Sequence, residues 1–217
     1  MADERKAGAL ILSNLGMFNE AAILFENVVE PTILEAIDFS VKAFTKENDN
    51  WEGEFGLADE DNDCWLAPAA WNTAESKDDD CYKAWFDIDL INDDGDYWTA
   101  LFCKQGSEGG EAGFMFNVDP RSFGGKNSWN SYIKNIDSNM VTKLEKSGFK
   151  HQGKGKFFLP VHLDVNEIKA AWEKYGDENT ENFAEDCLEP LSLALQTIQD
   201  NLVIFDEIMN GYSSNSK

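Results

Sequence analysis

The chain is poor in the residues that carry most catalytic chemistry. It has only two histidines, His151 and His162, in 217 residues. Neither is accompanied by a GxSxG serine elbow or by an acidic residue at a recognisable spacing, so no nucleophile, histidine and acid triad is predicted. We interpret His162, beside Leu163 on an expected strand, as a structural histidine. The sequence therefore predicts no catalytic residue and no cofactor.

Closely spaced cysteines are also lacking. The four cysteines are Cys64, Cys81, Cys103 and Cys187. This spacing contains neither the CxxC pairs of zinc sites nor the dense pattern of small secreted scaffolds. We expect reduced and mostly buried thiols.

Long hydrophobic runs are missing as well. The apolar residues 9–12 are followed at once by Ser13 and Asn14, and the first six residues mix both charge signs, unlike a secretory signal. No stretch approaches the roughly 18 apolar residues that a membrane span requires. We expect a cytoplasmic protein that does not act on a membrane.

Two loops begin like ligand-binding motifs and then depart from them. Residues 59–63 resemble the start of a calcium loop, but Cys64 replaces the sixth-position glycine and Ala70 the twelfth-position glutamate. Residues 150–156 combine lysines with glycines but match neither GxxxxGK[ST] nor GxGxxG. We interpret the first loop as an acidic surface loop and the second as a hairpin-like connection, which could contact an acidic surface.

Negative charge is abundant and unevenly distributed. The formal net charge is −23, from 41 acidic and 18 basic residues. Residues 47–96 hold 17 carboxylates against two lysines, a net −15, whereas residues 126–156 hold seven lysines against two carboxylates, a net +5. Phosphate backbones would be repelled by most of this surface, so direct binding of nucleic acid is not expected.

A basic protein is the partner that this charge favours, because long-range attraction raises the rate of encounter. Carboxylates spaced like DNA phosphates could also occupy the groove of a DNA-binding protein, in the manner of a DNA mimic. The alternative is that the acidity only confers solubility or reflects a salty habitat. The candidate partner-binding carboxylates belong to the acidic segment and are Asp59, Asp61, Asp63, Asp78, Asp79, Asp80, Asp93, Asp94 and Asp96.

Tryptophans accompany the carboxylates. Five of the seven lie in or beside the acidic segment, namely Trp51, Trp65, Trp71, Trp85 and Trp98. Tryptophan anchors many protein interfaces and can stack on Arg or Lys, but it also serves an ordinary core. Trp51 follows the polar run 46–50, so we expect it to be the most exposed of the five and a partner-binding residue.

Hydrophobic spacing predicts a mixed α/β fold. Apolar residues recur at helical intervals over 10–29 and 33–44, and both helices are expected to lie on a core. Residues 47–80 are expected to form a long loop with one or two short strands. Alternation over 82–90, turn residues 92–96 and the apolar run 97–103 predict a β-hairpin. A third strand is expected over 111–118.

The second half returns to helices around one more strand. One helix is expected over 127–147, ended by Gly148, and a second over 164–175, capped by Asp164 and closed by Gly176. A third is expected over 190–209, with an apolar stripe that faces the core. A strand over 156–163 contains Pro160, which predicts a sheet edge or a bulge there. We expect a mainly antiparallel sheet of four or five strands packed by helices, in the order α-α-β-β-β-α-β-α-α, as one domain over 1–210 with a disordered tail over 211–217.

The order helix, three strands, helix, strand is similar to the core of the PD-(D/E)XK nuclease superfamily, over about residues 31–163. In that family a metal ion lies between an Asp and the acidic residue of a (D/E)-x-K triplet on the sheet. Asp87 and Asp89 share one face of their expected strand and Glu111 begins a neighbouring strand, so the resemblance implies that these three could hold a divalent cation. No expected strand carries (D/E)-x-K.

The sequence thus favours an acidic inhibitor that binds and neutralises a basic protein, one that itself acts on nucleic acid. Immunity proteins, antitoxins and phage-encoded inhibitors of host defence all fit this description. The alternative is a divergent or inactive PD-(D/E)XK-like nuclease using Asp87, Asp89 and Glu111. The sequence predicts no oligomeric state.

Overall fold

A computed structural model gives the architecture of the chain and describes residues 2–59, 63–73 and 81–215. The chain begins with three helical segments, α1 (Ala2–Ser13), α2 (Leu15–Leu24) and α3 (Glu30–Glu47), the last two joined by a π-helical turn over Phe25–Val29. Pro31 lies in the first turn of α3, but Val29 and Glu30 before it are helical, so its missing N–H removes one intrahelical hydrogen bond next to the wider π-helical turn. The helix 33–44 predicted from the sequence is α3.

Six antiparallel strands form one sheet in the order β1-β2-β3-β4-β6-β5. The bounds are β1 Trp51–Gly56, β2 Asp63–Pro68, β3 Ala84–Ile91, β4 Glu111–Val118, β5 Lys150–Gly153 and β6 Lys156–Pro160. The prediction of a mainly antiparallel sheet packed by helices is confirmed, with six strands instead of four or five. The one or two short strands expected within 47–80 correspond to β1 and β2, which pair with each other, and the strand that was not expected is β5, which pairs with β6.

The predicted hairpin over 82–103 is wrong in its second half. Residues Trp98–Phe102 form a short helix, α4, and β3 pairs with β4 instead. The carboxylate of Glu30 accepts a hydrogen bond from the backbone N–H of Thr99 (3.0 Å) in the first turn of α4. That N–H has no partner inside the helix, so an acceptor from α3 stabilises the helical form.

The remaining helices are α5 (Lys126–Ile133), α6 (Ser138–Lys146), α7 (Val165–Tyr175), α8 (Thr180–Cys187) and α9 (Glu189–Asn215), with 3-10 turns over Ala69–Trp71 and Pro120–Phe123. The predicted helix over 127–147 is broken between α5 and α6, where Asp137 accepts from the N–H of Asn139 and caps α6. Asp164 caps α7 and Gly176 follows its end, as predicted. The helix α9 continues to Asn215, into the segment expected to be a tail.

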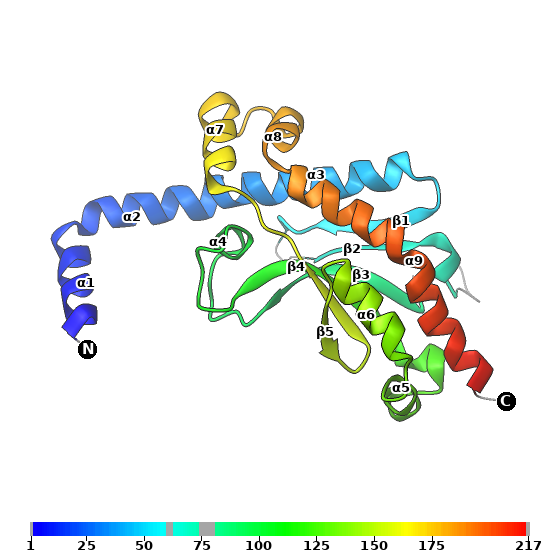
Figure 1. Cartoon of the computed structure of the whole chain (residues 1–217). Coiled ribbons are helices and arrows are strands. Elements are labelled where there is room, and N and C mark those ends of the chain that lie inside the picture. Colours follow the sequence, from blue (N-terminus) through cyan, green and yellow to red (C-terminus); the bar gives the residue numbers. More distant parts are fainter. Residues whose placement is uncertain (1, 60–62, 74–80, 216–217) are drawn as a thin grey trace.

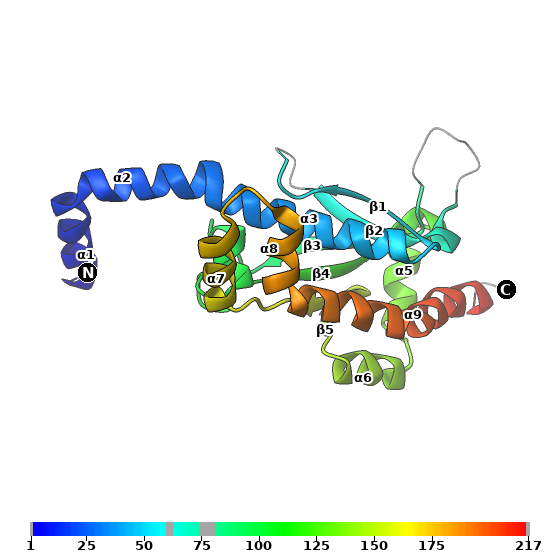
Figure 2. The same cartoon turned by 90° about the horizontal axis from the view of Figure 1, so that it is seen from above.

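The main core lies between the sheet and the helices α3 and α9, which cover the same face (Figures 1 and 2). Phe205 of α9 packs over the centre of that face, with ring centroids 4.5 Å from Phe116 of β4 and 5.1 Å from Phe86 of β3. The apolar stripe predicted on this helix faces the core, since Leu191, Ile198 and Phe205 are all fully buried. The sheet therefore has one covered face and one face turned away from these two helices.

Pro160 lies locally at an edge, as the sequence predicts. It pairs with Gly113 of β4, whereas the pairing of β5 with β6 stops at Phe158. The N–H of Val161 points toward β4, where it donates to the carbonyl of Ala112 (3.0 Å), so the nitrogen of Pro160 points to the side on which β5 has ended. The missing donor of proline therefore leaves no strand neighbour unpaired.

Candidate functional site

The side of the sheet opposite α3 and α9 carries acidic and aromatic residues. Along β3 the side chains alternate: Ala84, Phe86 and Ile88 are buried in the main core, and Trp85, Asp87 and Asp89 are half-buried on the other face. This alternation is the pattern that predicted the strand. Its polar half defines the open face of the sheet along β1 to β3, whereas the same face is buried on β4 and β6, at Met115, Asn117 and Phe158.

Strand register brings three of these residues together. Glu54 of β1 lies opposite Trp65 of β2, and Trp65 lies opposite Asp87 of β3. Directly opposed residues in antiparallel strands project on the same face at neighbouring positions. Glu54, Trp65 and Asp87 therefore form a row across the open face.

A pocket of about 420 Å³ lies at this row. Its lining combines carboxylates, aromatic rings and one guanidinium, contributed by β1, β2, the segment before β3, β3, the end of β4 and the turn after it. The residues are Glu54, Asp63, Trp65, Cys81, Tyr82, Trp85, Asp87, Val118, Asp119, Pro120 and Arg121. Four carboxylates against one arginine give the described lining an excess of negative charge.

Asp87 is a carboxylate of this lining whose two oxygens have different surroundings. Its Oδ2 accepts a hydrogen bond of 2.7 Å from the side-chain amide of Asn117 on β4. Its Oδ1 is buried and has no hydrogen-bond partner among the described residues. A buried carboxylate oxygen without a donor is costly, so a donor that met Oδ1 after a rotation of the side chain would stabilise the ionised form of Asp87.

The environment raises the pKa of Asp87 to about 7. Burial is the main cause, because it disfavours the charged form, and the carboxylates of Asp89 and Asp63 add to it. The amide of Asn117 and the ammonium of Lys156 act in the opposite direction. Asp87 therefore changes its charge near neutral pH, unlike an ordinary aspartate.

The aromatic side of the pocket is formed by Trp65, Trp85 and Tyr82. The rings of Trp65 and Tyr82 are 5.0 Å apart at an interplanar angle of 60°. The hydroxyl of Tyr82 donates to the carboxylate of Glu52 on β1, which holds the ring against the sheet. Aromatic faces next to carboxylates attract an ammonium or guanidinium group, through both the ring quadrupole and the charge.

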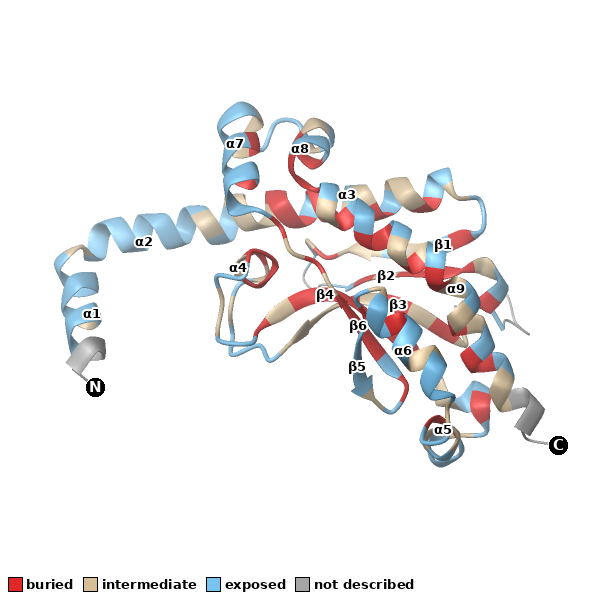
Figure 3. Cartoon of the chain, in the orientation of Figure 1, coloured by how far each residue is buried: buried red, intermediate tan, exposed pale blue. Residues whose placement is uncertain are grey.

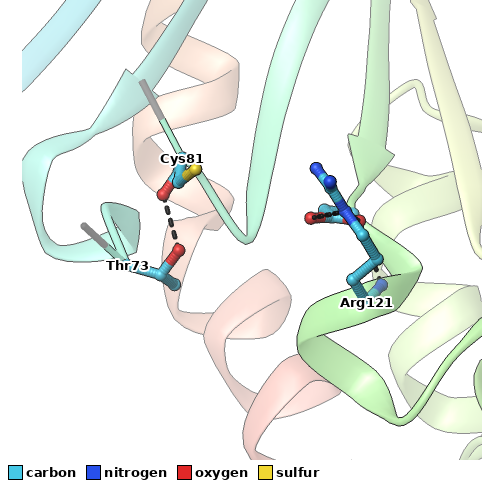
Figure 4. A network of polar contacts seen from close by, with 4 residues as sticks. Thr73, Cys81 and Arg121 are labelled. Carbon is cyan, nitrogen blue, oxygen red and sulfur yellow. Dashed lines mark hydrogen bonds and ion pairs between the residues drawn. The ribbon is translucent and has the colours of Figure 1, made fainter. Parts of the chain in front are cut away.

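The rim of the pocket is held by local polar contacts, which Figure 4 shows. Arg121 donates from Nε to both carboxylate oxygens of Asp119, at 3.0 and 2.9 Å. On the other side, the hydroxyl of Thr73 donates to the carbonyl of Cys81 (2.6 Å). Arg121 is highly exposed, so an incoming anion or carboxylate could displace it from Asp119.

The order of the strands separates the two kinds of charge. The acidic segment supplies β1, β2 and β3, which form one edge of the sheet, and the lysine-rich segment supplies β5 and β6 at the other edge. Ion pairs between described residues are formed by Glu111, Asp119, Glu173 and Asp186. The pocket lies on the acidic side of the sheet.

The expectation that Trp51 is exposed is wrong. Only 7% of its surface is accessible, and its ring packs edge-on against Phe44 of α3 at 5.4 Å. Trp51 begins β1, and the strand alternation turns it to the covered face of the sheet. It contributes to the core and is not placed to contact a partner.

The predicted carboxylates divide into three groups. Asp63 lines the pocket, and Asp59 is exposed nearby in the turn after β1. Asp93, Asp94 and Asp96 lie in the turn after β3, where Asp93 accepts from the N–H groups of Gly95 and Asp96, and Asp96 accepts from that of Ser107. Asp61, Asp78, Asp79 and Asp80 lie outside the described residues.

The predicted metal ligands only partly converge. Asp87 and Asp89 share the open face, but Glu111 is bound by Lys150 and by His162, whose Nε2 is 3.3 Å from Glu111 Oε1. Although burial would raise the pKa of Glu111, the hydrogen bond from Lys150 holds it below its usual value. Among residues 2–59, 63–73 and 81–215, no group of three or more His, Cys, Asp or Glu side chains is arranged to hold a metal ion.

Sequence reasoning missed Glu54, Tyr82, Asp119 and Arg121 as site residues. They are far apart in sequence and meet only through the β1–β2 and β3–β4 registers. The one available signal was the alternation of 84–91, which already placed Trp85 and Asp87 on the same face. No family model, curated protein or solved structure matches this chain.

Proposed function

We propose that this chain is an acidic binding protein that neutralises a basic protein, one that acts on nucleic acid, and that a Lys or Arg side chain of the partner enters the pocket at Asp87. The observation that carries the proposal is the combination of Asp87, with its unpartnered Oδ1, and the aromatic rings of Trp65 and Trp85 in one pocket. A guanidinium or ammonium would supply a donor once the Asp87 carboxyl rotates Oδ1 toward the pocket, and it would lie against the aromatic rings.

The titration of Asp87 links binding to pH. A cation favours the ionised carboxylate, so binding near pH 7 is accompanied by release of the Asp87 proton. Affinity for a cationic ligand should therefore rise as the pH increases through 7. Below that range Asp87 is neutral, and its contribution to cation binding is small.

The charge distribution supports a partner with a broad cationic surface. The sheet edge next to the pocket is built from the segment with a net charge of −15. Attraction to a basic surface raises the association rate at low salt, and it is reduced once the screening length falls to about 8 Å at physiological ionic strength. A DNA-binding protein or nuclease presents such a surface.

The test uses an oligo-arginine peptide as probe and tryptophan fluorescence as readout, since Trp65 and Trp85 line the pocket. Asp87→Asn keeps the shape but removes the charge, and it should weaken binding roughly 10- to 100-fold at pH 8. At pH 5, well below the pKa of Asp87, the variant and wild type should differ by about twofold or less. Asp177→Asn, in the exposed turn after α7 and outside both the acidic segment and the pocket, is the matched control and should bind like wild type at both values.

Equal affinities of wild type and Asp87→Asn at pH 8 would contradict the role of the pocket. If the probe bound with the same affinity at low and high salt, the electrostatic part of the proposal would be wrong. A low-salt capture of basic proteins from cell extract, repeated with Asp87→Asn, extends the test to natural partners. The nuclease alternative predicts instead that magnesium or manganese confers cleavage that Asp87→Ala abolishes.

A further inference from the structure

The N-terminal helices carry an unusual concentration of exposed apolar side chains. Eight of the thirteen exposed large hydrophobic residues found in the described parts of the chain lie between positions 10 and 24, with 39–72% of their surface accessible. They are Leu10, Ile11, Leu12, Leu15, Met17, Phe18, Ile23 and Leu24. Figure 3 shows α1 from Arg5 onward and most of α2 as mainly exposed, projecting from the sheet and its helices. We refer to residues 2–24 as the arm.

The position of the arm contradicts the expectation that the first helix lies on the core. Its apolar residues surround the helix instead of forming one stripe: in α2, successive 100° rotations place Leu15, Met17, Phe18, Ile23 and Leu24 at about 0°, 200°, 300°, 80° and 180°. A helix that is hydrophobic all round is normally buried. The arm therefore needs a covering surface on more than one side.

The residues that follow the arm are held to the rest of the fold. The ring of Phe25 packs edge-on against Tyr97 with centroids 4.8 Å apart, and the hydroxyl of Tyr97 donates to Glu26 (2.7 Å). From that point α3 is held against the sheet, while α1 turns sharply away from the longer helix, with a bend of 86° between Arg5–Ser13 and Leu15–Glu47. The projecting part is thus a bent, helical hook on a fixed base.

We propose that the arm binds the arm of a second copy of this chain. At roughly 80–100 Å² for each half-exposed side chain of this size, the eight residues present on the order of 700 Å². Two such surfaces in a twofold arrangement would bury at most about 1,400 Å² in total, which falls in the lower part of the range of about 1,200–2,000 Å² that stable interfaces bury. Because each arm is bent, two arms can contact each other on more than one side of the helix. A flat partner surface would contact one side only.

Charge favours a second copy at this place. Between residues 7 and 25 the only ionisable side chain is Glu20. Two copies with a charge of −23 each repel one another over most of their surface, and the arm is where they can meet without bringing many carboxylates together. Because salt screens the remaining repulsion and strengthens apolar association, dimerisation should increase with ionic strength. Binding of a basic protein should instead weaken as the ionic strength increases.

A lipid surface is the less favoured occupant. Arg5 and Lys6 are the only basic residues in the first 41 positions, and the body is strongly anionic, so an anionic membrane repels the chain. Within the described residues no single helix is long and apolar enough to cross a membrane, and only the bent pair Arg5–Ser13 with Leu15–Glu47 meets the criteria jointly.

The test measures the mass of the full chain by sedimentation equilibrium at low and high salt. Wild type should dimerise, and more tightly at high salt. The double variant Leu12→Glu with Met17→Glu, at positions 72% and 61% exposed, should raise the dissociation constant at least about 100-fold. The matched control is Leu193→Glu with Val203→Glu on α9, at 60% and 66% exposure, which should dimerise like wild type.

A wild-type chain that stays monomeric at both salt concentrations would overturn the proposal. So would equal loss of dimer in the arm variant and the α9 control, since the interface would then not depend on the arm. Flotation of a monomeric chain with phosphatidylcholine vesicles, abolished by the arm variant, would assign the arm to a lipid surface instead. Because Asp87 lies outside the arm, the oligo-arginine titration of each variant separates a failure here from a failure of the pocket.

Discussion

At the scale of single residues, Asp87 is a carboxyl whose pKa lies far above the ordinary value of its type. The same burial that separates its Oδ1 from solvent raises its pKa to about 7, against an ordinary value of 3.8. A carboxyl with a raised pKa holds its proton more tightly in the folded chain than in the unfolded chain. Protonation therefore stabilises the fold, and ionisation of Asp87 opposes it.

The stability contributed by protonated Asp87 should be fully present below about pH 4 and should be lost as the pH rises through 7. The shift corresponds to at most about 4 kcal/mol. We expect Asp87→Asn, which cannot ionise, to gain stability relative to wild type as the pH is raised from 5 to 8, as measured by urea unfolding at each pH. Asp94→Asn should show no such trend. A constant difference between Asp87→Asn and wild type over this range would contradict the raised pKa.

At the scale of elements, the contact between β4 and β6 depends on a missing side chain. A Cβ added at Gly113 would collide with the carbonyl oxygen of Leu159 and lie 2.8 Å from the Cα of Pro160. Backbone atoms on a paired strand cannot move aside without disturbing the pairing. Gly113 is therefore required for the close approach of the two strands.

We expect Gly113→Ala to lower the free energy of unfolding by about 1–3 kcal/mol, the usual cost of overpacking. Gly16→Ala, where an added Cβ meets nothing within 4 Å, is the matched control and should not destabilise the chain. Thermal and urea unfolding of both variants provide the measurement. Equal stability of the two would show that β6 tolerates displacement from β4.

The elements that the sequence predicted correctly are those whose pattern is long and local. The α9 stripe, the Asp164 cap of α7 and the alternation of β3 each depend on neighbours within one element. The run 97–103 was misassigned because a short apolar run fits a strand or a buried helix equally well. The contact that decides for a helix, Glu30 with the N–H of Thr99, spans 69 positions and leaves no local signal.

The candidate site was likewise predictable in its local patterns but not in its long-range contacts. Asp63, Trp65, Trp85 and Asp87 were recognisable as members of an acidic, aromatic segment, and β3 alternation placed two of them on one face. Their meeting with Arg121 depends on the pairing of β3 with β4, which the sequence interpretation had replaced by a hairpin. Trp51 was misplaced because its position after a polar run says nothing of which face its strand buries.

At the scale of the whole molecule, the strand order converts a charge pattern in sequence into a charge pattern in space. Acidic strands form one edge of the sheet and the lysine-rich hairpin forms the other. Such a field acts over distances longer than any contact, so it should influence how fast a basic partner arrives more than how long it stays. Pocket contacts should influence mainly the dissociation rate.

Replacing Asp78, Asp79 and Asp80 with serine should lower the association rate for an oligo-arginine probe at low salt and leave the dissociation rate nearly unchanged. Asp87→Asn should do the reverse at pH 8. Stopped-flow fluorescence at two salt concentrations distinguishes them, because only the first effect should vanish at high salt. A change in dissociation rate alone for the triple variant would place those aspartates in direct contact with the probe.

The two-residue period of β3 assigns the core and the pocket to the same eight positions, Ala84–Ile91. Inserting or deleting one residue within this strand would turn every later side chain of the strand to the opposite face of the sheet. Aromatic core residues would then face solvent, and carboxylates would face the interior. Substitutions can alter the two roles one at a time, but a length change cannot. During evolution, this strand should therefore tolerate exchanges of residues far better than insertions or deletions.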